Sequence, residues 1–297
     1  MLDSMTLNSG KLTKEQQDQY WDDGYLFPIQ AVSPVQALEW RKQLETLEAK
    51  WLDNGLPLPL NTYKRVNAQC VMPLACDIGL HPAILDAVEG ILGPDIMLYS
   101  VEFLIKEPCT KHVVTMHQDL TYWGMGDMDR ILTAWLAVSD ATTQSGCMDF
   151  VQGSHKNPIL PHEDSFDAHN LLSRGQEIVV DIAQEDKVAV ELMAGQISLH
   201  HGLTIHGSGP NVSDDRRIGV AIRYMSAKMT KAQGEKDFAI PARGDCTSGA
   251  LINYAPPSDD FSPESLKIYD KIRNVQAAVM MAGTKGKDGI GIYAKET

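Results

Sequence analysis

The amino-terminal third of the chain repeats apolar residues at helical spacing. Residues 12–27 begin with the capping residue Thr13 and turn extended after Gly24, which favours a short helix followed by a strand. A second helix is expected after Ser33-Pro34, with one buried stripe made of Trp40, Leu44, Leu47 and Trp51. A third helix is expected over residues 81–92, before Gly93-Pro94.

From about residue 95 the pattern changes to short apolar runs separated by Gly, Pro, Asn and Asp. The runs are "IMLYSVEFLIK", "RILTAWLAVSDA", "CMDFVQGSH", "QEIVVDI", "AVELMAGQISLHH" and "RRIGVAIRYMS". Many short strands without helical crossovers predict a mainly β sandwich or barrel with flanking helices, not a parallel α/β sheet. We expect one domain over 1–297, with a helical part at about 12–93, a β core at about 95–228 and a final helix at about 262–281.

The composition of the chain limits which classes of binding partner are expected. The 297 residues are 43% hydrophobic and 22% charged, which is ordinary for one globular core, and the net charge is −13 without any basic block. Nucleic acid and anionic membranes are therefore not expected as partners. No apolar run is long enough to span a bilayer and no signal peptide is recognisable, so a cytoplasmic protein is expected. The five scattered cysteines predict free thiols.

A histidine and an aspartate stand two residues apart in "TMHQDLTYW", residues 115–123. If this stretch is extended, His117 and Asp119 project to one side and Gln118 to the other, away from any shared ion. Two ligands at this spacing can chelate one metal ion. A lone His-x-Asp is nevertheless weak evidence, because such tripeptides are usually polar surface residues.

A second histidine-rich stretch, "SLHHGLTIHGSGPNVSDDRRIGVAIRY", covers residues 198–224. His206 is the preferred third ligand, and His200 and His201 compete for that position. Two histidines and one carboxylate on one face of a metal leave the opposite positions open, as in non-haem Fe(II) oxygenases.

The strand that follows places two arginines on opposite faces. One face carries Arg217, Gly219, Ala221 and Arg223, whereas Arg216 belongs to the apolar face that suits helix packing. The small residues beside Arg217 leave volume for a carboxylate that its guanidinium can hold with two hydrogen bonds.

Together these motifs resemble the phytanoyl-CoA dioxygenase-like family of Fe(II)- and 2-oxoglutarate-dependent oxygenases. The opening "LTKEQQDQYWDDGYLF" and the later "GCMDFVQGSHK" resemble further family segments, although Gln152 replaces the usual proline. The resemblance implies a double-stranded β-helix (jelly-roll, cupin-like) core, with Fe(2+) bound by His117, Asp119 and His206. It also implies 2-oxoglutarate bound by Arg217, with O2 as second cosubstrate.

Asp119 separates two chemistries within this resemblance. Related halogenases carry a small residue there, which leaves a coordination position for chloride, whereas a carboxylate fills that position. Hydroxylation of an aliphatic C–H, with release of succinate and CO2, is therefore favoured.

Further site residues are hypotheses. Lys106 and Thr133 are candidate contacts to 2-oxoglutarate, and the candidate substrate contacts are Glu102, Trp123, Arg174 and Gln176. The family resemblance allows many substrates, and we expect a small zwitterion such as an aminoalkylphosphonate, or else an acyl-CoA. The alternatives are a non-oxidative cupin-type metalloenzyme (isomerase, lyase or hydrolase) and a non-catalytic small-molecule-binding β-barrel. The oligomeric state is left open.

Overall fold

The computed structural model describes residues 5–6, 11–122, 125–164, 169–171, 176–180, 182–230, 236–247 and 251–280. Its helices are α1 (Lys14–Asp23), α2 (Pro34–Trp51), α3 (Leu60–Arg65), α4 (Pro73–Gly79), α5 (Pro82–Leu92) and α6 (Pro263–Met280). The expected start of α1 is confirmed, because Thr13 and Gln16 form a reciprocal capping box. Gly24 ends this helix with φ of 86°, a left-handed conformation that suits glycine. The helices α3 and α4 were not predicted.

Two facing sheets make up the core. The eight-stranded sheet has the order β1-β2-β10-β5-β12-β3-β13-β14, and the four-stranded sheet has the order β4-β11-β6-β9. The larger sheet contains β1 (Met5–Thr6), β2 (Tyr25–Gln30), β3 (Ile96–Lys106), β5 (Ile131–Ala137), β10 (Gln196–His201), β12 (Arg217–Ser226), β13 (Asp237–Arg243) and β14 (Leu251–Asn253). The smaller sheet contains β4 (Val114–His117), β6 (Met148–Val151), β9 (Lys187–Val190) and β11 (His206–Ser208). A separate hairpin pairs β7 (His162–Asp164) with β8 (Gln176–Ile178). This arrangement is the predicted double-stranded β-helix.

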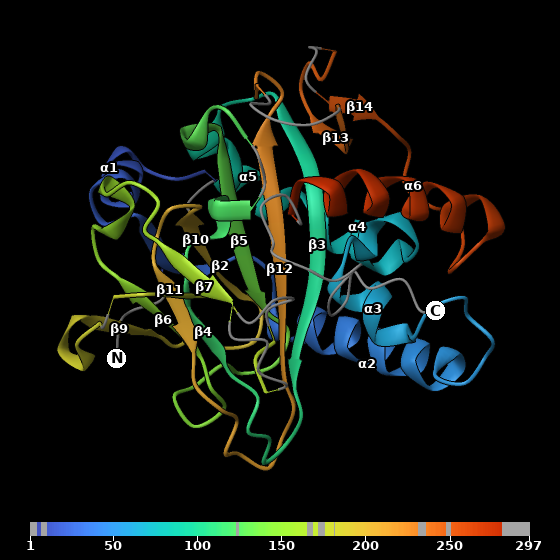
Figure 1. Cartoon of the computed structure of the whole chain (residues 1–297), viewed down its shortest axis with the longest axis horizontal. Helices are drawn as coiled ribbons and strands as arrows, with labels where there is room; N and C mark the ends of the chain where they lie inside the picture. The colour runs from blue at the N-terminus through green and yellow to red at the C-terminus, as the bar shows by residue number, and fades with distance from the viewer. Residues whose placement is uncertain are drawn as a thin grey trace.

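Each face of the large sheet has its own partner layer. Helices α3 and α4 contact β3, α5 contacts β5 and α6 contacts β13, so the helical layer covers one face (Figure 1). On the opposite face, Trp135 and Ala221 share an apolar cluster with Phe150 and Val190 of the smaller sheet. Charged side chains on this inner face therefore lie between two sheets.

Strand β12 has the predicted two faces. Ile218, Val220 and Ile222 lie in the core cluster shared with the helices. Arg216, just before the strand, forms ion pairs on the outside with Glu48 at 2.9 Å and with Glu107 at 2.9 Å.

The prediction for the His-x-Asp stretch was wrong in one respect. Strand β4 ends at His117, and Asp119 begins the 3-10 helix η3 (Asp119–Tyr122), so strand alternation does not continue through Asp119. The convergence of the two side chains described below results from this turn.

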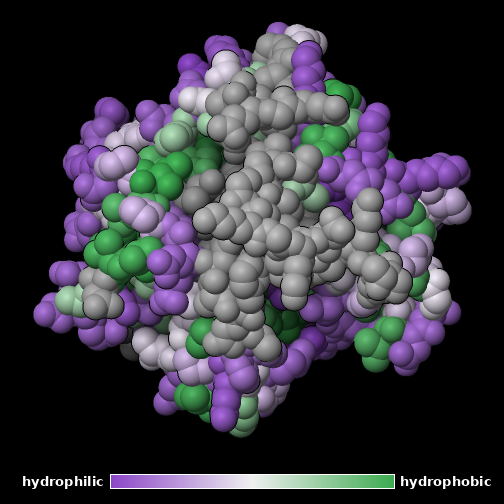
Figure 2. Space-filling view, in the orientation of Figure 1, coloured by the Kyte–Doolittle hydropathy of each residue, from purple (hydrophilic) through white to green (hydrophobic). Residues whose placement is uncertain are grey.

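No helix within the described ranges is long and apolar enough to cross a membrane. Where the face seen in Figure 2 is coloured, hydrophilic side chains dominate and hydrophobic ones form small separate groups.

Substitution of Gly219 tests the packing between the sheets. A Cβ atom at this position would overlap the indole ring of Trp135. We expect Gly219→Ala to lower the free energy of unfolding by about 1–3 kcal/mol, because overpacking forces the ring or the strand to move. Urea unfolding measures this difference. Gly209→Ala is the matched control, since no described residue beyond its two chain neighbours lies within 4 Å of the added Cβ. An equal loss of stability in both variants would contradict the packing argument.

Candidate metal centre

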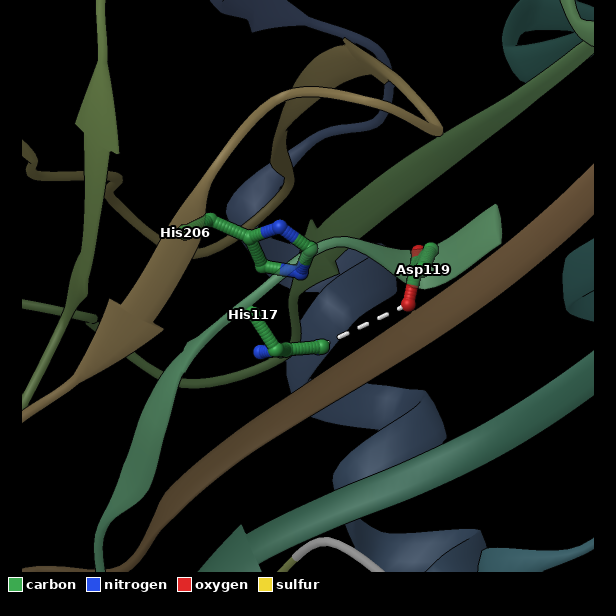
Figure 3. Close-up of side chains that lie close together, drawn as sticks. All are labelled: His117, Asp119 and His206. Atoms are coloured by element: carbon green, nitrogen blue, oxygen red, sulfur yellow. Dashed lines mark ion pairs between the residues drawn. The ribbon is translucent and has the colours of Figure 1, made fainter. Parts of the chain in front are cut away.

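Three potential metal ligands converge between the sheets. His117 ends β4 and His206 begins β11, and these residues are direct partners across the two antiparallel strands. Their ring centroids are 4.2 Å apart, and Asp119 completes the group from η3 (Figure 3). One ligand atom from each residue lies within 4.8 Å of the others, and all three residues are buried. A single ion can therefore be reached by all three side chains.

The backbone sets the orientation of both imidazoles. Nδ1 of His117 lies 2.9 Å from the Thr115 carbonyl, and Nδ1 of His206 lies 2.9 Å from the Thr204 carbonyl. A carbonyl oxygen only accepts, so each Nδ1 carries the proton and each Nε2 keeps a lone pair. Burial and the neighbouring His117 hold the pKa of His206 well below its usual range, which also favours the neutral ligand form.

Asp119 is kept ionised inside the protein. Burial alone raises the pKa of its carboxyl, but Arg223 and His117 hold that pKa well below the usual range. The Thr133 hydroxyl donates to Oδ2 at 3.1 Å, and Nη2 of Arg223 lies 3.5 Å from Oδ1. Metal ligation requires a deprotonated carboxylate, and these contacts supply it.

Gln118 takes no part in the ligand group. Its Nε2 donates to the Leu203 carbonyl at 2.9 Å, and its Oε1 accepts from the Leu160 backbone at 2.8 Å. The side chain is therefore fixed to neighbouring backbone, in agreement with the expectation that it turns away from the ligands.

Two buried cations lie at one end of the inner sheet face. Lys106 and Arg217 are register partners on β3 and β12, and both are almost fully buried. Arg217 donates to the Gly146 carbonyl at 2.8 Å and to the Leu104 carbonyl at 3.3 Å, whereas Lys106 donates to the Ser208 hydroxyl at 2.7 Å and to the Gly209 carbonyl. Neither cation forms an ion pair with a carboxylate in the described part of the chain.

The same end also contains two buried N–H donors that lack an acceptor in the described ranges. Arg217 Nε and the indole Nε1 of Trp135 are buried and have no hydrogen-bond partner among the described residues. The guanidinium lies 5.3 Å from the centre of the Trp135 ring. Burial lowers the pKa of Arg217 to about 10, and burial with the nearby Arg217 lowers the pKa of Lys106 to about 6. Buried positive groups with unsatisfied donors are the chemistry of an anion site.

Two of the remaining predicted site residues have described side chains. The Thr133 hydroxyl donates a hydrogen bond to Asp119, so in this structure it supports that carboxylate. Glu102 forms an ion pair with Arg223 at 2.7 Å. Trp123 and Arg174 lie outside the described residues, as does the side chain of Gln176 in β8.

Sequence reasoning gave no role to two residues near the ligand group, Trp135 and Arg223, and it left His200 and His201 as competitors of His206 for the third ligand position. Trp135 follows Thr133 by two positions on β5, so strand alternation could have placed it on the inner face. Arg223 was placed on the face of Arg217, but its contacts with Asp119 and Glu102 depend on long-range register. His200 lies 3.7 Å from Asp119 Oδ2 yet outside the three-ligand group, while His201 contacts Asp129 at 3.2 Å.

Curated relatives are similar in sequence to part of this chain. The human peroxisomal phytanoyl-CoA dioxygenase is 27% identical over 246 residues, which are 75% of this chain and 71% of that protein. For several other curated relatives the aligned segment spans only about half of the relative's length.

Solved structures and the family model extend the comparison. The non-haem monooxygenase ThoJ in its apo form has a TM-score of 0.80 and 31% identity, over 89% of this chain and 97% of that one. The non-haem α-ketoglutarate-dependent carbocyclase SnoK from nogalamycin biosynthesis has a TM-score of 0.59 and 25% identity, over 77% of this chain and 89% of that one. The family model for phytanoyl-CoA dioxygenase (PhyH) matches residues 20–219. With this match over more than half of its length, the chain belongs to the phytanoyl-CoA dioxygenase family, as the motifs had predicted.

Proposed function

We propose that this protein is an Fe(II)- and 2-oxoglutarate-dependent dioxygenase that hydroxylates an aliphatic C–H of a small metabolite and releases succinate and CO2. One observation carries the proposal: a buried group of two histidines and one carboxylate shares the inner sheet face with a buried cationic pocket. The family membership and the α-ketoglutarate dependence of SnoK, whose cosubstrate is 2-oxoglutarate under another name, support it.

The ligand group fits iron. His117 and His206 present Nε2 lone pairs, and Asp119 presents an ionised oxygen. Two imidazoles and one carboxylate are the ligands of the facial triad that leaves open positions on Fe(II). When bound there, iron supplies the redox chemistry, and the protein contributes placement and exclusion of water. The Nδ1 bonds to backbone carbonyls keep both rings in place for this role.

The cationic end fits the distal carboxylate of 2-oxoglutarate. A dicarboxylate would give Arg217 and Lys106 the negative partner that they lack in the described part of the chain, and Trp135 offers a further N–H donor. A non-oxidative metalloenzyme of the cupin type would need the three ligands but not this pocket. A vestigial binding protein would have no need of the complete set.

The opposite end of the same face suits a charged substrate. Glu102 and Arg223 have exposed side-chain fractions of 22% and 12%, whereas Lys106 and Arg217 are sealed. This pair offers both charges beside the ligand group, which favours a small zwitterion such as an aminoalkylphosphonate over an acyl-CoA.

We also propose that the protein is cytoplasmic and consists of a single domain.

Turnover provides the test of this function. With Fe(II), O2 and a panel of small zwitterions and acyl-CoA thioesters, we expect succinate release that at least one panel member stimulates. Asp119→Ala should lower the rate by at least about a hundredfold, because loss of a contact that only supports a metal ligand already costs about 10–100-fold and this variant removes the ligand itself. Succinate formation that is independent of iron, or equal in Asp119→Ala, would contradict the proposal.

Neighbouring arginines test the cosubstrate pocket. Arg217→Ala should raise the 2-oxoglutarate concentration for half-maximal rate by roughly ten- to a hundredfold, since it removes charge-assisted hydrogen bonds. Fe(II) affinity should remain nearly unchanged. Arg216→Ala is the matched control, because Arg216 contacts Glu48 and Glu107 on the outer face, and its 2-oxoglutarate requirement should stay within about twofold. The reverse pattern would show that the pocket is assigned to the wrong face.

Proton uptake on binding of 2-oxoglutarate tests the protonation of Lys106. Its pKa is about 6 in the free protein, and a bound carboxylate should raise that pKa towards the ordinary range. Between about pH 7 and pH 9, binding of 2-oxoglutarate should therefore take up close to one proton, and this uptake should fade below pH 6. Calorimetry of the anaerobic Fe(II) protein in buffers of different ionisation enthalpy measures it. Equal uptake in Lys106→Met would refute the assignment to Lys106.

A further inference from the structure

Arg223 joins two carboxylates at the metal centre. It lies on the inner face of β12, with Nη1 2.7 Å from Oε1 of Glu102 and Nη2 3.5 Å from Oδ1 of Asp119. Nη1 also lies 3.4 Å from the hydroxyl of Ser100, its register partner on β3. The guanidinium is thus held on one side by β3 and faces the ligand carboxylate on the other.

One oxygen of Asp119 faces both Arg223 and the ligand group. The closest approach of His117 to Asp119 joins Nε2 and Oδ1 at 3.6 Å, and Arg223 approaches the same Oδ1. The other oxygen, Oδ2, accepts the Thr133 hydroxyl. A metal ion bound by His117 and by Oδ1 of Asp119 would therefore compete with Arg223 for the lone pairs of Oδ1.

In the apoprotein, the Asp119 carboxylate depends on this arginine for charge compensation. Asp119 is 6% exposed, and a buried carboxylate is costly without an opposite charge. Among the described residues, Arg223 is the only arginine or lysine within 4.0 Å of the Asp119 carboxylate. Once a divalent cation is present, the same guanidinium is a like charge only a few ångströms away, and it opposes binding.

We propose that Arg223 is a positioning residue that compensates the Asp119 charge in the apoprotein and lowers the metal affinity of the ligand group. Glu102 moderates the effect, because it shares the guanidinium charge at 2.7 Å. The inference rests on the proposed metal centre. It predicts that apoprotein stability and metal affinity respond to Arg223 in opposite directions.

Co(II) is the probe, because its visible absorption reports binding without turnover. Arg223→Met should lower the melting temperature of the apoprotein, tighten the dissociation constant for Co(II) by roughly tenfold, and enlarge the rise in melting temperature that Co(II) causes. Arg223→Lys, which keeps the charge, should bind Co(II) with an affinity close to wild type.

A matched control separates this role from ordinary structural support. Arg243 on β13 also pairs with two carboxylates, Asp86 and Glu89, each at 2.7 Å, and it has no contact with the ligand group. Arg243→Met should lower the melting temperatures of apoprotein and Co(II) protein equally. Its Co(II) affinity should therefore be unchanged.

Glu102→Gln provides an independent test if Arg223→Met does not fold. Loss of the Glu102 carboxylate removes a negative charge 2.7 Å from the Arg223 guanidinium, so Co(II) should bind several-fold more weakly. Affinity that is unchanged or tighter in Glu102→Gln, or unchanged or weaker in Arg223→Met, would overturn the inference. If wild-type protein binds no Co(II), the proposed metal centre itself fails. If wild type binds and the variants show the wrong sign, only the role of Arg223 fails.

Discussion

The buried negative charge of Asp119 is the constraint on which the interior of this protein depends. Burial opposes ionisation, and two strands of the large sheet offset that cost. Thr133 on β5 and Arg223 on β12 are direct register partners, and both reach the same carboxylate. A slip of one residue between these strands would turn one of the two groups to the helical layer. The pairing of β5 with β12 therefore sets the electrostatics of the site.

Like charges are separated along a single strand. Arg217 and Arg223 share the inner face of β12 and are six residues apart, a distance of roughly 20 Å in extended backbone. Between them stand Gly219 and Ala221, and the Trp135 ring packs over Gly219. In the proposed function, one arginine belongs to a sealed anion pocket and the other to a partly open end beside the candidate metal ligands. This polarity supports a cosubstrate at one end and a substrate at the other.

The local pattern of apolar and polar residues predicted a large part of this architecture. Period-two alternation assigned Arg216 and Arg217 to opposite faces, and the strand-rich region after residue 95 and the closing helix were also predicted. The His-x-Asp stretch was misread as continuous strand, because a 3-10 turn that begins at Asp119 has no distinct apolar period. Contacts such as Glu102 to Arg223 depend on strand register across 121 positions, which one sequence without an alignment does not specify.

The most direct measurement is an anaerobic titration of the apoprotein with Fe(II) and 2-oxoglutarate, followed by visible absorption. The account predicts a weak charge-transfer band that requires both additions, and predicts its absence in Asp119→Ala together with weaker Fe(II) binding. A wild-type protein that shows no such band, combined with unchanged Fe(II) affinity in Asp119→Ala, would contradict the assignment of His117, Asp119 and His206 as the iron site.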